Sequence, residues 1–399
     1  MKRKIKLDFN FLYFIILIPF FKTDFLARFS HISQFFNLTK FASIIFIFLT
    51  IYKNKYISKK MQVLILFSLT IIVPTFIYSG DNSAVFNYFL SFWCLSYLVD
   101  TLNKNRKFLG TLLFIFEMYI YINFATMLIY PNGMYSTGTL LTGIAYQNWF
   151  LGFKNILICY FLPAYIVSYL YMNITGKKLR TIILSIIIFI STFIAGSATT
   201  LIGLSILLIF SIFSFLQRQY KIFNFKNYII VTIVMFFGIV IFRLQDLFGF
   251  LIVDILNKDL TFTGRTKLWN ITINAIKQKP FIGHGWQNTN IRHFMYGSST
   301  IITAHNQILE YLYLGGIVSL IILILLLIIV NKDLKKYYQD KNVQIISLGF
   351  LIYQILNLTE VYLNPIVLLL LILPIFGDKF AFKEERKISN EIINNSSSL

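Results

Sequence analysis

The chain alternates between long apolar runs and shorter polar segments that carry most of its Lys and Arg residues. A membrane-spanning helix needs about 20 predominantly apolar residues, and about 17 can suffice. Twelve runs approach or reach this length, so the pattern predicts an all-α, polytopic integral membrane protein with about twelve transmembrane helices. The predicted spans are 8–21, 36–52, 61–79, 84–99, 108–130, 155–172, 181–195, 201–216, 228–242, 306–330, 343–358 and 361–376.

These runs divide the chain into four parts. Residues 1–242 hold the first nine predicted spans, 243–305 form one large polar loop, 306–376 hold the last three spans, and 377–399 form a tail. The first run follows a basic start, as in a secretory signal peptide. Because no small-residue cleavage site comes after it, we expect it to remain as the first helix.

Composition and charge support a membrane location. The chain is 57% hydrophobic with a mean hydropathy of +0.72, which is more apolar than a soluble domain of 399 residues can bury in one core. The net charge of +20 comes from short basic clusters between apolar runs, so no nucleic-acid partner is expected. Placing both termini in the cytoplasm puts 25 of the 36 Lys and Arg residues inside and the loop 243–305 on the extracellular or periplasmic side.

The loop 243–305 shows signs of internal structure. Thr263 can cap a helix whose apolar positions 269, 273 and 276 share one face, and Pro280 ends it. We expect this amphipathic helix to lie on the membrane surface or under the loop. Glycines on both sides of His284 predict a tight turn, where a structural role is favoured over a catalytic one.

A second outer segment, 131–154, has little charge but several amides and aromatic rings, among them Gln147, Asn148 and Trp149. Amides bond to sugar hydroxyls and rings pack on sugar C–H faces, so Asn148 is a candidate sugar-binding residue. Aromatic belts at membrane interfaces have the same composition. A purely interfacial role therefore remains open for this segment.

The candidate chemistry of the large loop is cationic. Arg243, Arg265, Lys267 and Arg292 accompany His305, which directly precedes the predicted span 306–330. Arginine can hold phosphate oxygens through two parallel hydrogen bonds, and histidine can accept a proton near neutral pH. Together they suit attack by a hydroxyl on a carbon that bears a diphosphate leaving group. No metal-ligand or cofactor-binding motif appears, so neither a metal nor a cofactor is expected.

The role of each of these residues has a simpler alternative interpretation. An arginine near a membrane usually meets lipid phosphate, which is the favoured interpretation of Arg292. Arg265 follows a glycine at a helix start, where free N–H groups and a guanidinium can bind one anion together, while His305 could merely cap the next helix. The main rival function is transport, but transport pathways are lined by ionisable groups within spans, and only Glu117 lies near mid-span.

Three motifs occur in order in the loop region: Gly264-Arg265-Thr266-Lys267-Leu268-Trp269, Pro280-Phe281-Ile282-Gly283-His284-Gly285 and His305-Asn306-Gln307-Ile308-Leu309-Glu310, followed by Gly316. Their order, spacing and position resemble the signature of the O-antigen ligase and Wzy-type polysaccharide polymerase superfamily. The segment 143–155 resembles an earlier outer motif of that family. Trp269 stands where ligases often have Leu, which favours a polymerase.

The resemblance implies a metal-independent, inverting glycosyltransferase that polymerises undecaprenyl-diphosphate-linked oligosaccharide repeat units of an O-antigen, capsule or exopolysaccharide. It would act at the outer face of the bacterial cytoplasmic membrane, with Arg265 holding the diphosphate and His305 as the base. Ligation of glycan to a lipid or wall acceptor is the alternative. Besides membrane lipids, a flippase and a chain-length regulator are expected partners. The candidate substrate-binding residues are Arg292, Arg243, Lys267, Asn148, Asn306 and Glu310.

Overall fold

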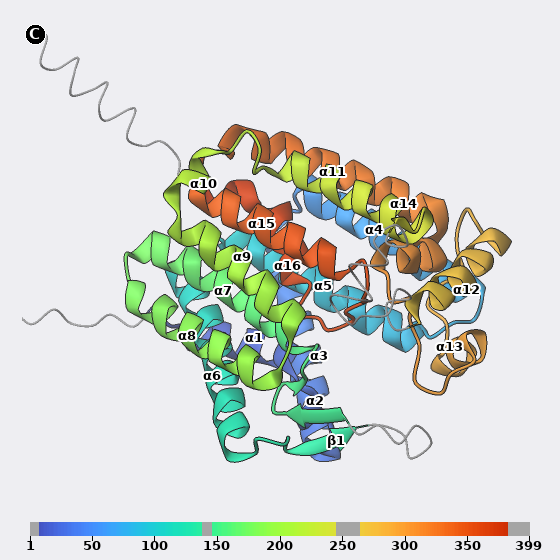
Figure 1. Cartoon of the computed structure of the whole chain (residues 1–399), viewed down its shortest axis with the longest axis horizontal. Coiled ribbons are helices and arrows are strands. Elements are labelled where there is room, and N and C mark those ends of the chain that lie inside the picture. The colour runs from blue at the N-terminus through green and yellow to red at the C-terminus, as the bar shows by residue number, and fades with distance from the viewer. Residues whose placement is uncertain (1–7, 138–145, 245–263, 382–399) are drawn as a thin grey trace, which may run out of the picture.

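The computed structural model describes residues 8–137, 146–244 and 264–381, which are mostly helical (Figure 1). The predicted tail beyond residue 381 and the loop residues 245–263 lie outside this description. The helices are α1 (Phe11–Leu17), α2 (Asp24–Ala27), α3 (Ser30–Asn54), α4 (Lys59–Ile77), α5 (Asn82–Leu102), α6 (Arg106–Ile129), α7 (Leu157–Thr175), α8 (Lys178–Ala195), α9 (Ala198–Ile212), α10 (Ser214–Arg218), α11 (Phe225–Met235), α12 (Arg265–Gln278), α13 (Thr289–Tyr296), α14 (Gln307–Leu334), α15 (Lys341–Leu356) and α16 (Leu369–Ile375). Short 3-10 helices cover Ile18–Phe21, Lys335–Tyr337 and Gly377–Phe380, and a π-helix covers Phe236–Ile241.

Seven of the described helices are long and apolar enough to cross a membrane: α3, α4, α5, α6, α7, α8 and α14 with its 3-10 extension. Four shorter apolar helical segments coincide with further predicted runs: Phe11–Phe21, Thr200–Ile212, Phe225–Ile241 and Lys341–Leu356. The structure therefore confirms a polytopic, mostly helical membrane protein. Twelve complete spans are not confirmed.

The last predicted span, 361–376, does not form one continuous helix. Residues 361–364 are irregular, 365–368 form a turn, and only α16, seven residues long, is α-helical. The side chain of Asn364 accepts a hydrogen bond from the backbone N–H of Ile366, and Pro365 between them has no N–H to give. These local features favour a turn where hydropathy alone predicts a helix. The short helix that follows is buried throughout.

At the centre of the bundle lies α7, in which every residue from 157 to 171 is buried. It packs against α6, α8, α15 and α9. A helix that is apolar all round has no face suited to water or to a polar surface, so it belongs in the interior. Figure 1 shows α7 enclosed among these helices.

A small antiparallel sheet corrects the prediction of a purely α-helical chain. Its strands are β1 (Tyr135–Thr137), β2 (Tyr146–Trp149) and β3 (Gly152–Phe153), in the order β1-β2-β3. Asn148 pairs with Tyr135 on one side and with Phe153 on the other. Such short strands carry too few residues for an alternating pattern to stand out among the surrounding apolar runs.

Glu117, the mid-span carboxylate, binds another helix. Both of its oxygens accept from Arg180 at the start of α8, at 2.9 Å from Nε and 2.5 Å from Nη2. Because this ion pair joins α6 to α8, Glu117 has a structural partner. It gives little support to a transport pathway through the bundle.

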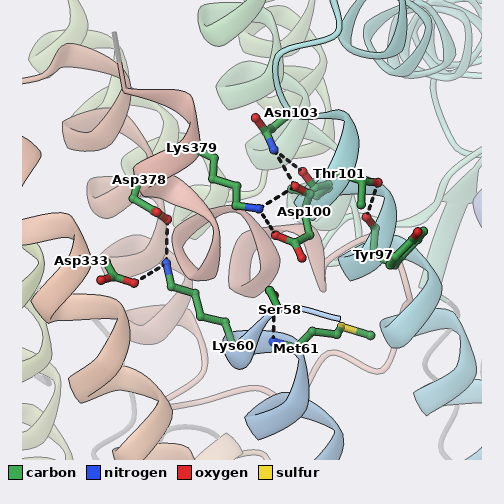
Figure 2. Close-up of polar contacts among 11 residues, drawn as sticks. Ser58, Lys60, Met61, Tyr97, Asp100, Thr101, Asn103, Asp333, Asp378 and Lys379 are labelled. Carbon is green, nitrogen blue, oxygen red and sulfur yellow. Dashed lines mark hydrogen bonds and ion pairs between the residues drawn. The ribbon is translucent and has the colours of Figure 1, made fainter. Parts of the chain in front are cut away.

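A group of ionised side chains, here called the Lys60 cluster, joins four elements at one end of the bundle (Figure 2). Lys60 of α4 lies 2.9 Å from Asp333 of α14 and 2.6 Å from Asp378 of the last 3-10 helix. Next to it, Lys379 forms an ion pair with Asp100 of α5. The cluster therefore ties the start of α4 to the ends of α5 and α14.

At the other end of the bundle, α14 is interrupted at Gly316, whose φ and ψ of 64° and −165° are not helical. The interruption frees the N–H groups of Ile317 and Val318 from the pairing within the helix. They donate instead to the carbonyls of Pro280 and Phe281, at 2.8 and 3.2 Å. A Cβ on residue 316 would lie 2.2 Å from the oxygen of Phe281, so this approach requires glycine.

The same interruption frees two carbonyls of α14. In a continuous helix the oxygens of Tyr313 and Leu314 would accept from residues 317 and 318. Here they accept from the N–H groups of His284 and Gly285, at 2.7 and 2.9 Å. The segment 280–285 thus inserts into α14 and satisfies all four displaced backbone groups.

Candidate functional site

The site begins at Arg265, the first residue of α12. Gly264 precedes it in the left-handed conformation, with φ 82°, and Thr263, the expected cap, lies outside the described residues. The predicted apolar face is present: Trp269 is 1% exposed and packs in a cluster with Leu309 of α14. This packing fixes α12 against α14 and thereby fixes the position of Arg265.

Arg265 and His305 meet at one carboxylate, that of Glu360. Arg265 Nη2 is ion-paired with Oε1 of Glu360, and Nδ1 of His305 lies 3.0 Å from Oε2. These three residues are here called the Glu360 cluster. Their side chains are 23%, 28% and 20% exposed for Arg265, His305 and Glu360, so each is partly sheltered yet reachable.

Backbone contacts hold the two sides of this cluster together. Asn306 caps α14 by accepting from the N–H of Leu309, and its amide donates to the carbonyl of Leu358 at 2.9 Å. The N–H of Gln307 donates to the carbonyl of Asn357, also at 2.9 Å. The start of α14 is therefore fixed to the segment that follows α15, which carries Glu360.

His305 itself has an unusual backbone. Its φ is 49°, in the left-handed region that a residue with a Cβ rarely occupies. The indole N–H of Trp269 lies 3.4 Å from its carbonyl oxygen. Strained backbone of this kind persists where the surroundings enforce it and is common at functional sites.

The charge state of Glu360 follows from its neighbours. Burial acts to raise its pKa, but the hydrogen bond with His305 and the positive charge of Arg265 outweigh this effect and lower the pKa below the ordinary 4.5. Glu360 is therefore a carboxylate at neutral pH. Nδ1–H of His305 then donates to it, and Nε2 becomes the ring nitrogen that can accept a proton.

Arg292 lies in a different environment. Its side chain is 4% exposed, and Nη2 lies 2.5 and 2.7 Å from the two oxygens of Glu310, while Nε donates to the carbonyl of Ile302. Glu310 also accepts from the N–H of Ala304 at 2.8 Å. Two candidate substrate-binding residues are thus bound to each other, and they shape the chain just before His305.

A small cavity adjoins this pair, lined by Arg292, Glu310 and Trp286 among others. Its volume is about 40 Å³. Since one water needs roughly 10–15 Å³ on this measure, the space holds a few waters at most. A diphosphate or a sugar ring does not fit there, so the described contacts give Arg292 and Glu310 a structural role.

Of the other candidate residues, some lie near Arg265 and some have structural contacts. Lys267 is exposed on α12, and Arg243 donates to the side chain of Asn270 on the same helix at 2.8 Å, so both cations belong to the surroundings of Arg265. Asn148 is 3% exposed and donates to Thr137 Oγ1 and to the carbonyl of Tyr146, within the small sheet. Asn306, fully buried, acts as the helix cap described above.

His284 occupies the predicted turn, between two glycines with φ of 68° and 71°. Its ring stacks on Tyr313 with centroids 4.7 Å apart, and Nε2 lies 2.8 Å from the carbonyl of Ala275. Burial lowers the pKa of His284, against the effect of that carbonyl. A neutral ring that donates to a carbonyl is a structural element, as the turn predicts.

Glu360 is the site residue that motif reasoning missed. It lies 95 residues from Arg265 and 55 from His305, and outside all three loop motifs. The available signal was a carboxylate at the end of an apolar run, since ionisable residues near a membrane are costly and are kept for a purpose. Across the described ranges, no group of three His, Cys, Asp or Glu residues is arranged to hold a metal ion.

Comparison with known proteins bears on this region. Residues 183–324 match a family model described as O-antigen ligase, and the match covers Arg265, Arg292 and His305. No curated protein and no solved structure matches the chain. The resemblance drawn from the loop motifs is confirmed, and the match supports an enzyme of the O-antigen ligase and Wzy superfamily, whose members act in the membrane on lipid-linked glycans.

Proposed function

We propose that the chain is a metal-independent, inverting glycosyltransferase that polymerises undecaprenyl-diphosphate-linked oligosaccharide repeat units. It works at the outer face of the bacterial cytoplasmic membrane, with both termini in the cytoplasm, and contributes to an O-antigen, capsule or exopolysaccharide. The observation that carries the proposal is the Glu360 cluster, because one carboxylate brings together an arginine, a residue type that binds phosphate well, and a histidine oriented through Nδ1.

The reaction joins an acceptor hydroxyl to the anomeric carbon of the donor glycan. Nε2 of His305 takes the hydroxyl proton as the new C–O bond forms, and the bond from the anomeric carbon to the diphosphate breaks with inversion. Arg265 stabilises the charge on the departing diphosphate. Glu360 holds the ring of His305 in one tautomer and stabilises the imidazolium that forms, as a carboxylate does in other His-based catalysts.

Arg265 can serve the diphosphate and Glu360 together. A guanidinium has five N–H donors in a planar fork, so one arginine can bond to a carboxylate and to phosphate oxygens at the same time. In this proposal Lys267 and Arg243 add positive charge near the start of α12. The Arg292–Glu310 pair, Asn306 and Asn148 support the walls of the site through the contacts described above.

Ligation is the second candidate, because the matching family model is described by that activity. Trp269, the residue that favours polymerisation in the sequence, is buried beneath the site and donates to the carbonyl of His305. Its contacts serve either reaction equally. The distinction therefore lies in the acceptor.

The test is a reaction with purified full-length protein and a lipid-linked repeat unit, without nucleotide sugar or divalent metal. A polymerase gives a ladder of products that grow by one repeat unit. A ligase gives a product only when a separate lipid or wall acceptor is added. A strict requirement for metal in either assay would contradict the proposed mechanism.

The proposed orientation has its own test. A cysteine introduced at Asn288, an exposed position before α13, should react with a membrane-impermeant reagent added to intact cells. Labelling only after permeabilisation would place the site on the cytoplasmic side. A flippase and a chain-length regulator are the proposed protein partners, since the donor must reach the outer face and the polymer must stop growing.

A further inference from the structure

A large cavity lies between α3 and α5, apart from the Glu360 cluster. Its volume is about 730 Å³, and its wall combines Lys40, Asn37 and Asn87 with apolar side chains such as Phe41 and Phe86. Phe41 and Phe86 are 62% and 38% exposed. Most of α3 faces outward, away from the rest of the bundle. The cavity thus has polar groups next to a surface suited to hydrocarbon.

Two lysines bind the amides of this wall. Nζ of Lys40 donates to Oδ1 of Asn87 at 2.8 Å, and Lys40 is only 9% exposed. Nζ of Lys22 donates to Oδ1 of Asn37 at 3.0 Å and to Ser33 at 3.2 Å. Because each asparagine uses its oxygen for a lysine, its NH₂ group remains as a hydrogen-bond donor.

Neither ammonium group has a carboxylate partner among residues 8–137, 146–244 and 264–381. By contrast, at least one aspartate is ion-paired with each of Lys60, Lys177 and Lys379. Burying an unpaired charge is costly, and more so in a membrane helix. Asp81 also lines the cavity, but it caps α5, and one carboxylate cannot balance two lysines.

The cavity lies on the same side of the bundle as the large loop. The N–H of Asp81 donates to the carbonyl of Trp286 at 2.7 Å, and Trp286 belongs to the segment that continues from the insertion into α14. With the orientation proposed above, this is the outer leaflet. A ligand can reach the cavity from the lipid phase along α3.

We propose that this cavity binds the phosphate-bearing headgroup of a lipid, with Lys40 neutralising the phosphate, Lys22 adding positive charge behind Asn37, and the chain lying along Phe41. Phosphate oxygens accept from ammonium and amide N–H groups, which are the donors on the wall. An apolar tail is accommodated by the exposed rings. Membrane phospholipid and polyprenyl phosphate share this chemistry, and the site is separate from the Glu360 cluster.

The test measures binding, so it does not depend on turnover. Full-length protein in a neutral detergent is titrated separately with phosphatidylglycerol, with undecaprenyl phosphate and with inorganic phosphate, and bound lipid is counted by native mass spectrometry. Lys40→Gln keeps a group that can bond to Asn87 but removes the charge, so lipid affinity should fall about fivefold or more. Lys53→Gln, at an exposed position near the other end of α3, is the matched control and should bind as the wild type does.

A second measurement guards against misfolding. Without added lipid, Lys40→Gln should melt at the same or a higher temperature than the wild type, because it removes an uncompensated buried charge. Binding of phosphatidylglycerol that depends on Lys40 identifies a membrane phospholipid, and binding of undecaprenyl phosphate alone identifies an isoprenoid lipid; both support the site. Equal affinity of Lys40→Gln for every lipid, a lower melting temperature without lipid, or equally tight binding of inorganic phosphate would each overturn the proposal.

Discussion

The two ion clusters at opposite ends of α14 are both built from ionisable side chains but differ in their balance of charge. The Lys60 cluster has two ammonium groups and three carboxylates, all supplied by the chain. The Glu360 cluster has one carboxylate for Arg265 and His305, with the exposed Lys267 two residues from the arginine. The first cluster has carboxylates in excess, whereas in the second one carboxylate is shared by a guanidinium and a neutral imidazole, and the positive charge of Lys267 lies nearby.

The difference in balance separates two uses of ionised groups in a membrane protein. Where carboxylates match or exceed the cations, as around Lys60, the chain satisfies its own charges and joins helices. Where cations exceed carboxylates at a partly exposed place, an anion is the missing partner. By this criterion we expect the Glu360 cluster and the cavity at Lys40 to bind ligands, and the Arg292–Glu310 pair to be structural.

The largest expected effect is that of removing the base. His305→Ala should lower turnover by about two to four powers of ten, the usual contribution of a general base. His305→Asn provides the sharper comparison, because asparagine tolerates the left-handed backbone of residue 305 and keeps an N–H donor for Glu360, but it accepts no proton near neutral pH. In vitro chain elongation with purified variants measures both. Robust product from His305→Asn would remove His305 from the chemistry and leave it a structural role.

Arg265→Lys should be nearly as inactive as Arg265→Ala. Lysine keeps the charge but loses the planar fork that can bind the diphosphate and Glu360 at once. The same elongation assay, with the donor concentration varied, measures the loss. His284→Ala, which alters a structural turn in the same segment, is a comparison variant and should do less damage to turnover. Near-wild-type activity of Arg265→Lys would mean that a point charge suffices.

Glu360→Gln should reduce turnover less than His305→Ala, because the base remains but loses its orienting carboxylate. A pH profile of stability distinguishes this role from simple packing. The pKa of Glu360 is lowered in the folded protein, so its stabilising effect is fully present above the ordinary value of 4.5 and is lost as the pH falls through the folded value.

The melting-temperature difference between wild type and Glu360→Gln should therefore be constant above about pH 5 and shrink in more acidic solution. A difference that is independent of pH throughout would assign Glu360 a packing role only. Asp378→Asn, in the Lys60 cluster, is a control for the general effect of removing a carboxylate. It should leave turnover unchanged.

The smallest effect on activity is expected in the Lys60 cluster. Lys60→Gln leaves Asp333 and Asp378 without their ammonium partner and should lower the free energy of unfolding by about 1–3 kcal/mol. Because both carboxylates are partly exposed, water offsets some of the loss. Melting temperature in detergent measures the change, and turnover per folded molecule should stay near wild type. A large loss of turnover at unchanged stability would show that the two ends of α14 are coupled.

The length of the apolar runs predicted the long helices well, because each is apolar over a full membrane thickness, as in α6 and α14. It failed where a few residues override hydropathy. In the predicted span 361–376, Asn364 and Pro365 favour a turn, and only a short helix follows. The strands around Tyr146 are too short to show a pattern of their own. In such places local hydrogen bonds determine the structure, and their strength is not visible in an average over many residues.

The site was predictable only in part. Arg265 and His305 stood out because they lie in motifs that are local in sequence. Glu360 did not, because it reaches them only when the segment after α15 folds against the start of α14, where Asn306 binds Leu358. The ion pair of Arg292 with Glu310 was not foreseen, since a cation in a loop and a cation in a buried pair have the same sequence. Which carboxylate pairs with an arginine is decided by the tertiary fold.

The break in α14 also limits how the enzyme can move. The segment 280–285 shares four backbone hydrogen bonds with the helix around Gly316, and pulling it away would leave two amides and two carbonyls unpaired near the membrane. We therefore expect this segment to stay attached to α14 between catalytic cycles. If the chain is the polymerase proposed above, its growing glycan would pass along a fixed wall, and processivity would depend on the contacts between polymer and wall.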